Sequence, residues 1–265
     1  MVNEPKESLK YLEKALRCAQ EYDEQCGDVD SKISETLLSD IYNNLSLAYY
    51  LLEEYETSIT YADLAIDTPP IKSVEYSNRG NALCSLGRYE EAMDDYEKAV
   101  ELDETNSYAY YGKGLVYCRW NDYNKAIESF DHCLLLNKND IDSYQGIIWC
   151  HYYLDNYDEV LELSDKALAI DGSNISIHEA KGYAILEKDG YNEAEKYFKL
   201  ISEGFPDNIR AQMLPGKLYY ENEDYQAALE HFIIIKDKMG SNTDLDYWII
   251  LCYRALGIPD EAEVF

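Results

Sequence analysis

The sequence YSNRGNALCSLGRYEEAMDDYEKA (residues 76–99) decides the fold of this chain. Its small and its large apolar residues recur every three or four positions, the spacing at which side chains share one face of a helix. The polar segment LGRYE at 86–90 interrupts this pattern and is too short to form a strand. The stretch therefore predicts two antiparallel helices joined by a short turn.

The tyrosine at position 89 recurs every 34 residues along the chain. The six positions are Tyr55, Tyr89, Tyr123, Tyr157, Tyr191 and Tyr225. Below, offsets are counted from this reference tyrosine, so that −9 lies nine residues before it. Most units carry a small residue at −9 and at +3, which lets two helices approach closely, and the next step of the period falls on Pro259. A period this regular predicts a stack of equivalent units instead of a globular domain with one central core.

The residues that repeat resemble those of the tetratricopeptide repeat (TPR) family. The second unit carries the resemblance most fully, in Tyr76, Gly80, Leu83, Gly87, Tyr89, Ala92, Tyr96 and Ala99. The fourth unit departs from the pattern, with Ile148 and Val160 in place of small residues and Ser164 in place of an aromatic one. The resemblance implies an all-α fold, a right-handed α-solenoid of antiparallel helix pairs known as the TPR superhelix.

We expect the array to occupy residues 33–265, with six full repeats at about 39–242 and a partial seventh at 243–265. Residues 5–32 should form an N-terminal helix and turn that resemble the second helix of a preceding repeat. The apolar face of this helix is predicted to hold Leu9, Leu12, Leu16 and Ala19. The chain ends at Phe265 without the polar helix that usually closes a solenoid, which suggests a longer array or capping by another chain.

The charge of the chain narrows the choice of partner. It has 52 acidic against 23 basic residues, a net charge of −29. Nucleic acids and anionic membrane surfaces require cations on the protein, so neither is expected as a partner. A protein or peptide ligand that is neutral or basic fits this charge. The seven cysteines form no CxxC pair and, together with an N-terminus that lacks an apolar leader, predict a reduced, cytoplasmic protein.

Motifs for catalysis, metals or cofactors are missing from the sequence. None of the four histidines lies three or four residues from another, and no HExxH, GxSxG or phosphate-binding glycine motif occurs. Acidic residues such as Glu90 and Asp94 fit a solvated helix face. We therefore expect no enzyme activity, no metal and no cofactor.

A ligand site is predicted on the first helix of each repeat. If offsets −13, −9 and −6 point into the stack, then −11, −8 and −4 point away from it, toward the concave groove where the resembled family binds peptides. The candidate groove residues are Asn43, Asn44, Asn78, Asn81, Tyr108, Tyr111 and Trp149. The asparagines could pair with a peptide backbone or simply be exposed. The aromatic residues, beside Gly112 and Gly146, could form a side-chain pocket or pack against a neighbouring helix.

The family's carboxylate clamp, which holds chaperone C-termini, is not expected here. It requires Lys and Arg in the repeat after a groove asparagine, where this chain has Tyr108 and Gly112, or Val74 and Asn78. The sequence thus favours a non-catalytic protein–protein interaction scaffold that binds a peptide or protein segment in its groove. Two alternatives stay open: a self-assembling structural module, and the substrate-recruiting part of a larger enzyme.

Overall fold

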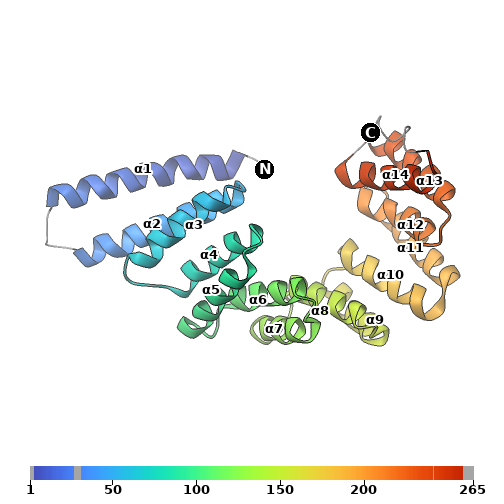
Figure 1. The fold of residues 1–265 in the computed structure, drawn as a ribbon, viewed down its shortest axis with the longest axis horizontal. Helices are drawn as coiled ribbons and strands as arrows, with labels where there is room; N and C mark the ends of the chain where they lie inside the picture. The colour runs from blue at the N-terminus through green and yellow to red at the C-terminus, as the bar shows by residue number, and fades with distance from the viewer. Residues whose placement is uncertain (1–2, 27–30, 241, 259–265) are drawn as a thin grey trace. The chain divides into compact units, whose positions relative to one another are not determined.

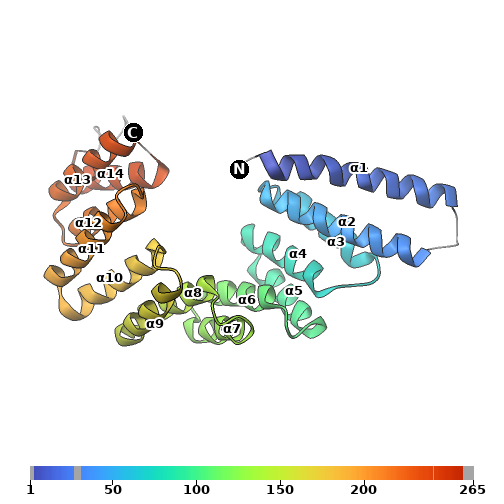
Figure 2. The same ribbon diagram turned by 180° about the vertical axis from the view of Figure 1, so that it is seen from behind.

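The computed structural model describes residues 3–26, 31–240 and 242–258, and all regular secondary structure in these ranges is α-helical. The helices are α1 (Asn3–Cys26), α2 (Ser31–Leu51), α3 (Tyr55–Asp67), α4 (Ser73–Ser85), α5 (Tyr89–Leu102), α6 (Ser107–Arg119), α7 (Tyr123–Leu136), α8 (Ile141–Tyr153), α9 (Tyr157–Ile170), α10 (Ile175–Asp189), α11 (Tyr191–Gly204), α12 (Ile209–Glu221), α13 (Tyr225–Met239) and α14 (Thr243–Ala255). Consecutive helices run antiparallel in pairs, from α2–α3 onward (Figures 1 and 2). The predicted all-α class is confirmed.

The chain divides into two compact units, Met1–Gly146 and Ile147–Phe265, here called the N-terminal unit and the C-terminal unit. In the N-terminal unit each helix from α1 to α7 packs on the next, and α4 also contacts α2 and α6. In the C-terminal unit α9 to α14 pack in the same consecutive manner, and α12 contacts α10 and α14. The predicted division into residues 5–32 and 33–265 concerns sequence repeats, not compactness, and stays a prediction.

The reference tyrosine is the first residue of the second helix in each of the six pairs. Two residues before it the backbone is usually left-handed, with φ of +62° at Glu53 and +77° at Gly87. The amide at −1 then donates to the carbonyl at −6, as from Arg88 to Leu83 at 2.9 Å. This is the Schellman arrangement that ends a helix and reverses the chain. Gly257, with φ of +76°, places the same turn before position 259; Pro259 itself lies outside the described residues.

Asparagine begins the first helix in several repeats. At offset −17, Asn106, Asn174, Asn208 and Asn242 each accept a hydrogen bond from the backbone amide three residues later. Asp140 occupies the same offset and accepts from the amide of Ser143 at 3.1 Å. These side chains satisfy amides that have no partner inside the helix. The connection between repeats is thus fixed by a single polar side chain.

In four repeats the core contains an aromatic residue at offset +7, packed against the glycine at offset −9 of the same repeat. Tyr96, Phe130, Phe198 and Phe232 are at most 1% exposed. A Cβ atom at Gly80 would lie 2.8 Å from the Tyr96 ring, and one at Gly112 would lie closer still. Gly112 therefore makes room for the aromatic residue of the preceding repeat.

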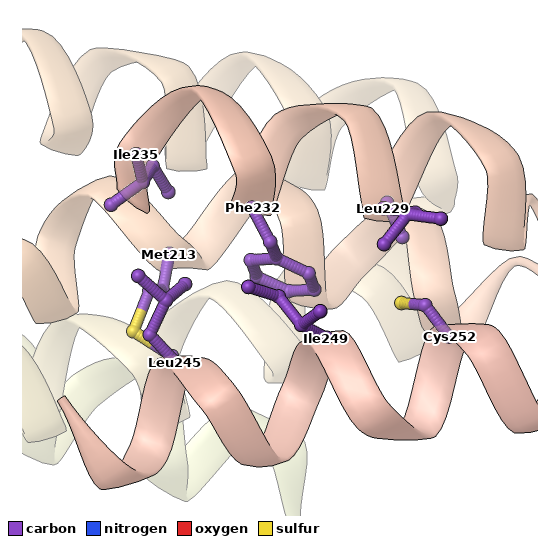
Figure 3. Close-up of a cluster of buried hydrophobic side chains, with 8 residues drawn as sticks. Met213, Leu229, Phe232, Ile235, Leu245, Ile249 and Cys252 are labelled. Atoms are coloured by element: carbon purple, nitrogen blue, oxygen red, sulfur yellow. The ribbon is translucent and has the colours of Figure 1, made fainter. Parts of the chain in front are cut away.

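The C-terminal unit repeats this arrangement around Phe232. Figure 3 shows this ring beside Leu229 and Ile235 of α13 and above Leu245 and Ile249 of α14. Because these side chains are closely packed, truncation of any one of them would leave a cavity. Each aromatic residue at +7 therefore links one repeat to the next.

Helix α1 packs on α2 through the apolar face expected from the sequence. Leu9, Leu12, Leu16 and Ala19 contact the cluster that contains Ile41 and Leu45. None of the helices in the described ranges combines the length and the apolar character needed to cross a bilayer.

Candidate functional site

The N-terminal unit contains a surface pocket of about 320 Å³ that brings together three of the predicted site residues. We call it the Tyr108 pocket. Its lining consists of Tyr50, Asn81, Ser107, Tyr108, Tyr111, Leu115, Cys133, Asn137, Asp140 and Asp142. Of the predicted residues, Asn81, Tyr108 and Tyr111 contribute to it.

Consecutive repeats supply the walls of the pocket. Tyr50 comes from the end of α2, Asn81 from α4, and Tyr108, Tyr111 and Leu115 from α6. The floor and rim come from α7 and from the start of α8. Tyr108 is 72% exposed and Leu115 is 40% exposed. Large apolar groups left open beside a pocket are typical of ligand and protein contact surfaces.

Other side chains of the pocket are held in place by internal bonds. The Oδ1 atom of Asn81 accepts a hydrogen bond of 2.8 Å from the Tyr96 hydroxyl, and its Nδ2 has no hydrogen-bond partner among the described residues. The Tyr111 ring packs on Phe130 with ring centres 5.4 Å apart. Burial, together with the charges of Asp142 and Asp140, raises the pKa of Tyr111 to about 12. The Tyr111 hydroxyl is therefore a neutral hydrogen-bonding group at physiological pH.

The surroundings of the Cys133 thiol in the pocket make it unreactive. The Sγ atom of Cys133 donates to the carbonyl oxygen of Ser107 at 3.3 Å. Burial raises the pKa of Cys133, which disfavours the thiolate form needed for nucleophilic attack or metal binding. Among the described residues no group of three or more His, Cys, Asp or Glu side chains is placed to hold a metal.

The asparagines at offset −11 lie outside the pocket. The Nδ2 atom of Asn78 donates to Oδ1 of Asn43 at 2.8 Å, which ties α4 to α2. Asn44 is exposed on α2, and its side chain makes no hydrogen bond with the described part of the chain. Asn78 and Asn43 thus hydrogen-bond to each other, whereas the side chain of Asn44 is available to a ligand.

The sequence-based assignment of offset −11 to the open face is wrong for the later repeats. Gly112 is buried, and Ala180 and Leu214 are at most 1% exposed. The reason is visible at Gly112, where the Tyr96 ring of the preceding repeat occupies the adjoining space. Likewise, the Phe130 ring lies against Gly146. Of the aromatic residues expected to form a side-chain pocket beside these glycines, Tyr108 and Tyr111 line the Tyr108 pocket and Trp149 does not. Offset −8 stays more open, with Leu47 at 42% and Leu115 at 40% exposure.

Trp149 lies in the C-terminal unit and is not part of the Tyr108 pocket. Its Nε1 donates to the Ser176 hydroxyl at 3.3 Å, and its ring meets Tyr152 edge-on with centres 5.6 Å apart. Tyr153 also contacts it, at 6.1 Å between ring centres. The two ring contacts lie within α8, and the bond to Ser176 connects Trp149 to α10.

Sequence reasoning missed several lining residues for identifiable reasons. Leu115 has the offset −8 of Asn81 and could have been inferred from it. Asp140 lies in a connection between repeats, outside the helix positions from which the groove was predicted. As the N-cap of α8 it nevertheless has a fixed position. Tyr50 comes from α2 and Asp142 from α8, so only the stacking of four consecutive repeats places them in one pocket.

Comparison with known proteins identifies the repeats. The family described as "TPR repeat" matches residues 80–120, and the family described as "Tetratricopeptide repeat" matches residues 39–71 and 107–140. This chain belongs to the tetratricopeptide repeat family. No curated protein matches the sequence. The matched TPR segments include the residues of α4, α6 and α7 that line the Tyr108 pocket.

Solved structures of TPR proteins share the fold. A tetratricopeptide repeat protein from Parabacteroides merdae is 16% identical, with 92% of this chain and 99% of that chain covered and a TM-score of 0.65. PilF of Pseudomonas aeruginosa is also 16% identical, with 84% and 98% covered and a TM-score of 0.63. YrrB, described as a TPR protein with an unusual peptide-binding site, is 23% identical, with 74% and 97% covered and a TM-score of 0.51. The predicted α-solenoid of TPR helix pairs is thereby confirmed.

Proposed function

We propose that this TPR protein is a non-catalytic interaction module that binds a segment of another protein in the Tyr108 pocket and on the adjoining first helices. Repeats of this family generally serve as protein-interaction scaffolds. The observation that carries the proposal is the exposed Tyr108, which stands 72% open to solvent beside a pocket of about 320 Å³. A rigid aromatic side chain at such a place is a typical anchor for a bound segment.

The bound segment should be neutral or basic. The net charge of −29 repels acidic ligands, and no Lys, Arg or His lines the pocket. A chaperone C-terminal carboxylate would need cations there. The absence of cations in the lining therefore supports the expectation that this chain is not a carboxylate clamp.

Selection of peptides on the intact chain tests the proposal. A random dodecapeptide display library would be panned on the wild-type protein, and each enriched peptide would be measured against Tyr108→Ala. We expect the dissociation constant to rise at least about tenfold, because truncation of an aromatic anchor removes 2 kcal/mol or more. Tyr11→Ala is the matched control, since Tyr11 is 65% exposed on α1, away from the pocket. Equal binding by wild type and Tyr108→Ala would refute the pocket as the site.

A second variant asks how far along the array the ligand extends. Asn44→Ala removes a side chain that is exposed and makes no internal bond, so the fold should be unaffected. A loss of affinity would extend the site along α2 beyond Tyr50, whereas unchanged affinity would confine the ligand to the Tyr108 pocket. Self-assembly, recruitment for a larger enzyme and a cytoplasmic location stay predictions, of which the first is tested by light scattering over a range of concentrations.

A further inference from the structure

We infer that the Tyr108 pocket receives a cationic side chain, arginine or lysine, of the bound segment, with Asp142 and Asp140 as the groups that recognise it. The inference rests on the proposed function and adds to it the chemistry of one ligand residue. Three tyrosines, two amides and two carboxylates line the pocket, together with Ser107, Leu115 and Cys133. This combination offers acceptors and aromatic faces but no cation.

The two carboxylates lack a positive partner within the chain. Neither Asp140 nor Asp142 forms an ion pair with any residue of the described ranges. Lys138, which stands in the same connection, is exposed and does not line the pocket. Elsewhere in the described structure, lysines and arginines pair with nearby acids, as in Arg79–Asp95 and Lys113–Glu97. Asp142 and Asp140 are therefore free to bind a cation from outside.

The carboxylates line the same pocket as the rings of Tyr50, Tyr108 and Tyr111. Their charges act on the Tyr111 hydroxyl, which means that the carboxylates and the ring belong to one electrostatic environment. A guanidinium or ammonium group is attracted both to carboxylates and to the face of a tyrosine ring. Tyr108 and Tyr50 add further aromatic surface beside the two carboxylates. An arginine gains most from this arrangement, because it can stack and donate at the same time.

The N-terminus of α8 does not reverse this preference. A helix N-terminus carries about half a positive charge, which disfavours cations near it. Asp140 already compensates part of that charge, because it accepts the amide of Ser143 at 3.1 Å. Asp142, which is exposed in the first turn of α8, contributes a second full negative charge. The net field in the pocket is therefore negative.

The chain itself suggests a variant that removes the charge and keeps the fold. Asparagine caps the first helix at the position of Asp140 in four other repeats, at Asn106, Asn174, Asn208 and Asn242. Asp140→Asn should therefore keep the cap, and Asp142→Asn changes an exposed residue. The control is Glu90→Gln/Glu128→Gln, which removes two exposed charges of the same unit outside the pocket. Circular dichroism should give the same spectrum for all three proteins.

The test uses the dodecapeptide library at 150 mM NaCl on wild type, on Asp140→Asn/Asp142→Asn and on the control. We expect peptides enriched on wild type and on the control to be rich in arginine or lysine, and those from Asp140→Asn/Asp142→Asn to match the library. For a single enriched peptide, loss of the two carboxylates should raise the dissociation constant about tenfold, as should replacement of its key cation by glutamine. The carboxylate variant and the peptide variant combined should raise the dissociation constant no more than either change alone. Such non-additivity would show that the carboxylates contact the cation of the peptide directly. Arginine-to-lysine replacement then separates the two cations.

The outcomes separate this inference from the proposed function. Peptides that depend on Tyr108 but show the same arginine and lysine content on wild type and on Asp140→Asn/Asp142→Asn would overturn the cation inference and leave the pocket as the site. Equal loss of affinity in the Glu90→Gln/Glu128→Gln control would also overturn it, because the attraction would then come from the overall charge. Peptides that bind Tyr108→Ala as well as wild type, or failure of wild type to enrich any peptide, would overturn both.

Discussion

The N-terminal unit and the C-terminal unit follow the same 34-residue period but differ in what they bury. Among the described residues, ten buried polar or charged side chains lie in the N-terminal unit, and only Ser164 and Glu179 lie in the C-terminal unit. Around Phe198 and Phe232 the C-terminal unit instead buries aliphatic side chains such as Leu214 and Ile249. One repeat period is thus compatible with two kinds of contact between repeats.

The polar contacts of the N-terminal unit connect specific atoms. Arg79 on α4 donates to Asp95 on α5 and to Asp63 on α3, and Asn106 donates to Ser73 and Ser77. Hydrogen bonds fix both distance and direction, whereas apolar contacts stabilise without choosing one orientation. Directional bonds therefore connect the helices of the unit that contains the Tyr108 pocket; they also occur in the C-terminal unit, where Lys217 on α12 donates to Glu179 on α10 at 2.6 Å. Such rigidity suits a preformed binding site.

The largest difference between the units should appear when a core aromatic residue is changed. Phe232→Ala should lower the free energy of opening of α12–α14 by about 3–5 kcal/mol, because it removes a fully buried ring and leaves a cavity. In the N-terminal unit, Tyr96→Phe keeps the ring and removes only the bond to Asn81, at a cost of about 1 kcal/mol. Hydrogen-exchange mass spectrometry of the intact chain measures both. If Phe232→Ala and Tyr96→Phe lowered the free energy of opening by similar amounts, packing of the ring would contribute no more than the single hydrogen bond.

The next largest effect should come from the buried ion pair of the N-terminal unit. Arg79→Ala leaves Asp95, whose side chain is only 7% exposed, without its cation. We expect a loss of about 2–3 kcal/mol in the opening of α3–α5, somewhat below the usual range for a broken buried pair since Arg79 is itself 25% exposed.

Two further variants define what the Arg79 result means. Arg79→Met/Asp95→Leu should recover most of the stability, because it removes both charges together. Lys196→Ala breaks the exposed pair Lys196–Glu193 of the C-terminal unit and should change nothing measurable. If Arg79→Ala were as harmless as Lys196→Ala, the pair would contribute no more than a surface contact.

Asn106 and Asn242 occupy the same position of the repeat, offset −17, and allow the stability of the two units to be compared there. Asn242 in the C-terminal unit caps α14 by accepting the amide of Leu245 at 2.8 Å. Asn106 caps α6 and also donates to Ser73 and Ser77. Replacement by Ala should therefore cost about 1 kcal/mol at Asn242 and about 2 kcal/mol at Asn106. Equal values from hydrogen exchange would mean that the extra bonds of Asn106 add nothing beyond the cap.

The helices and the repeat were predictable from the sequence because each depends on local spacing. The reference tyrosine marks the start of every second helix, since the turn before it has the same length in nearly every repeat. The ligand site was only partly predictable. Asn81 was found from its offset, and Tyr108 and Tyr111 as positions near the predicted groove offsets. Asp140 and Asp142 belong to the connection and helix that follow, and their relation to Tyr111 depends on how adjacent repeats stack. Offset −11 was misjudged at Gly112 because the Tyr96 ring of the preceding repeat occupies the space beside it.

The smallest expected difference between the units is their response to pH. His178 and His231 lie in the C-terminal unit, and burial lowers the pKa of each below its ordinary value of 6.5. The neutral His178 ring makes two hydrogen bonds: its Nε2 donates to the Gly172 carbonyl at 3.1 Å, and its Nδ1 accepts from the Tyr197 hydroxyl at 2.7 Å. The bond to Gly172 favours the charged ring, but the effect of burial outweighs it. Nearby lysines oppose a charge on either ring, Lys181 at His178 and Lys199 and Lys238 at His231.

A lowered histidine pKa makes the C-terminal unit sensitive to mild acid. The unfolded chain binds protons first as the pH falls, so this contribution to stability is complete above pH 6.5 and is lost as the pH falls from 6.5 through the folded-state pKa. The histidine of the N-terminal unit, His132, is exposed. Hydrogen exchange at pH 7.5 and 5.5, corrected for the intrinsic rates, should show protection falling more in α10–α13 than in α4–α7. His178→Gln/His231→Gln should remove that difference; if the difference persists in this variant, other groups cause it.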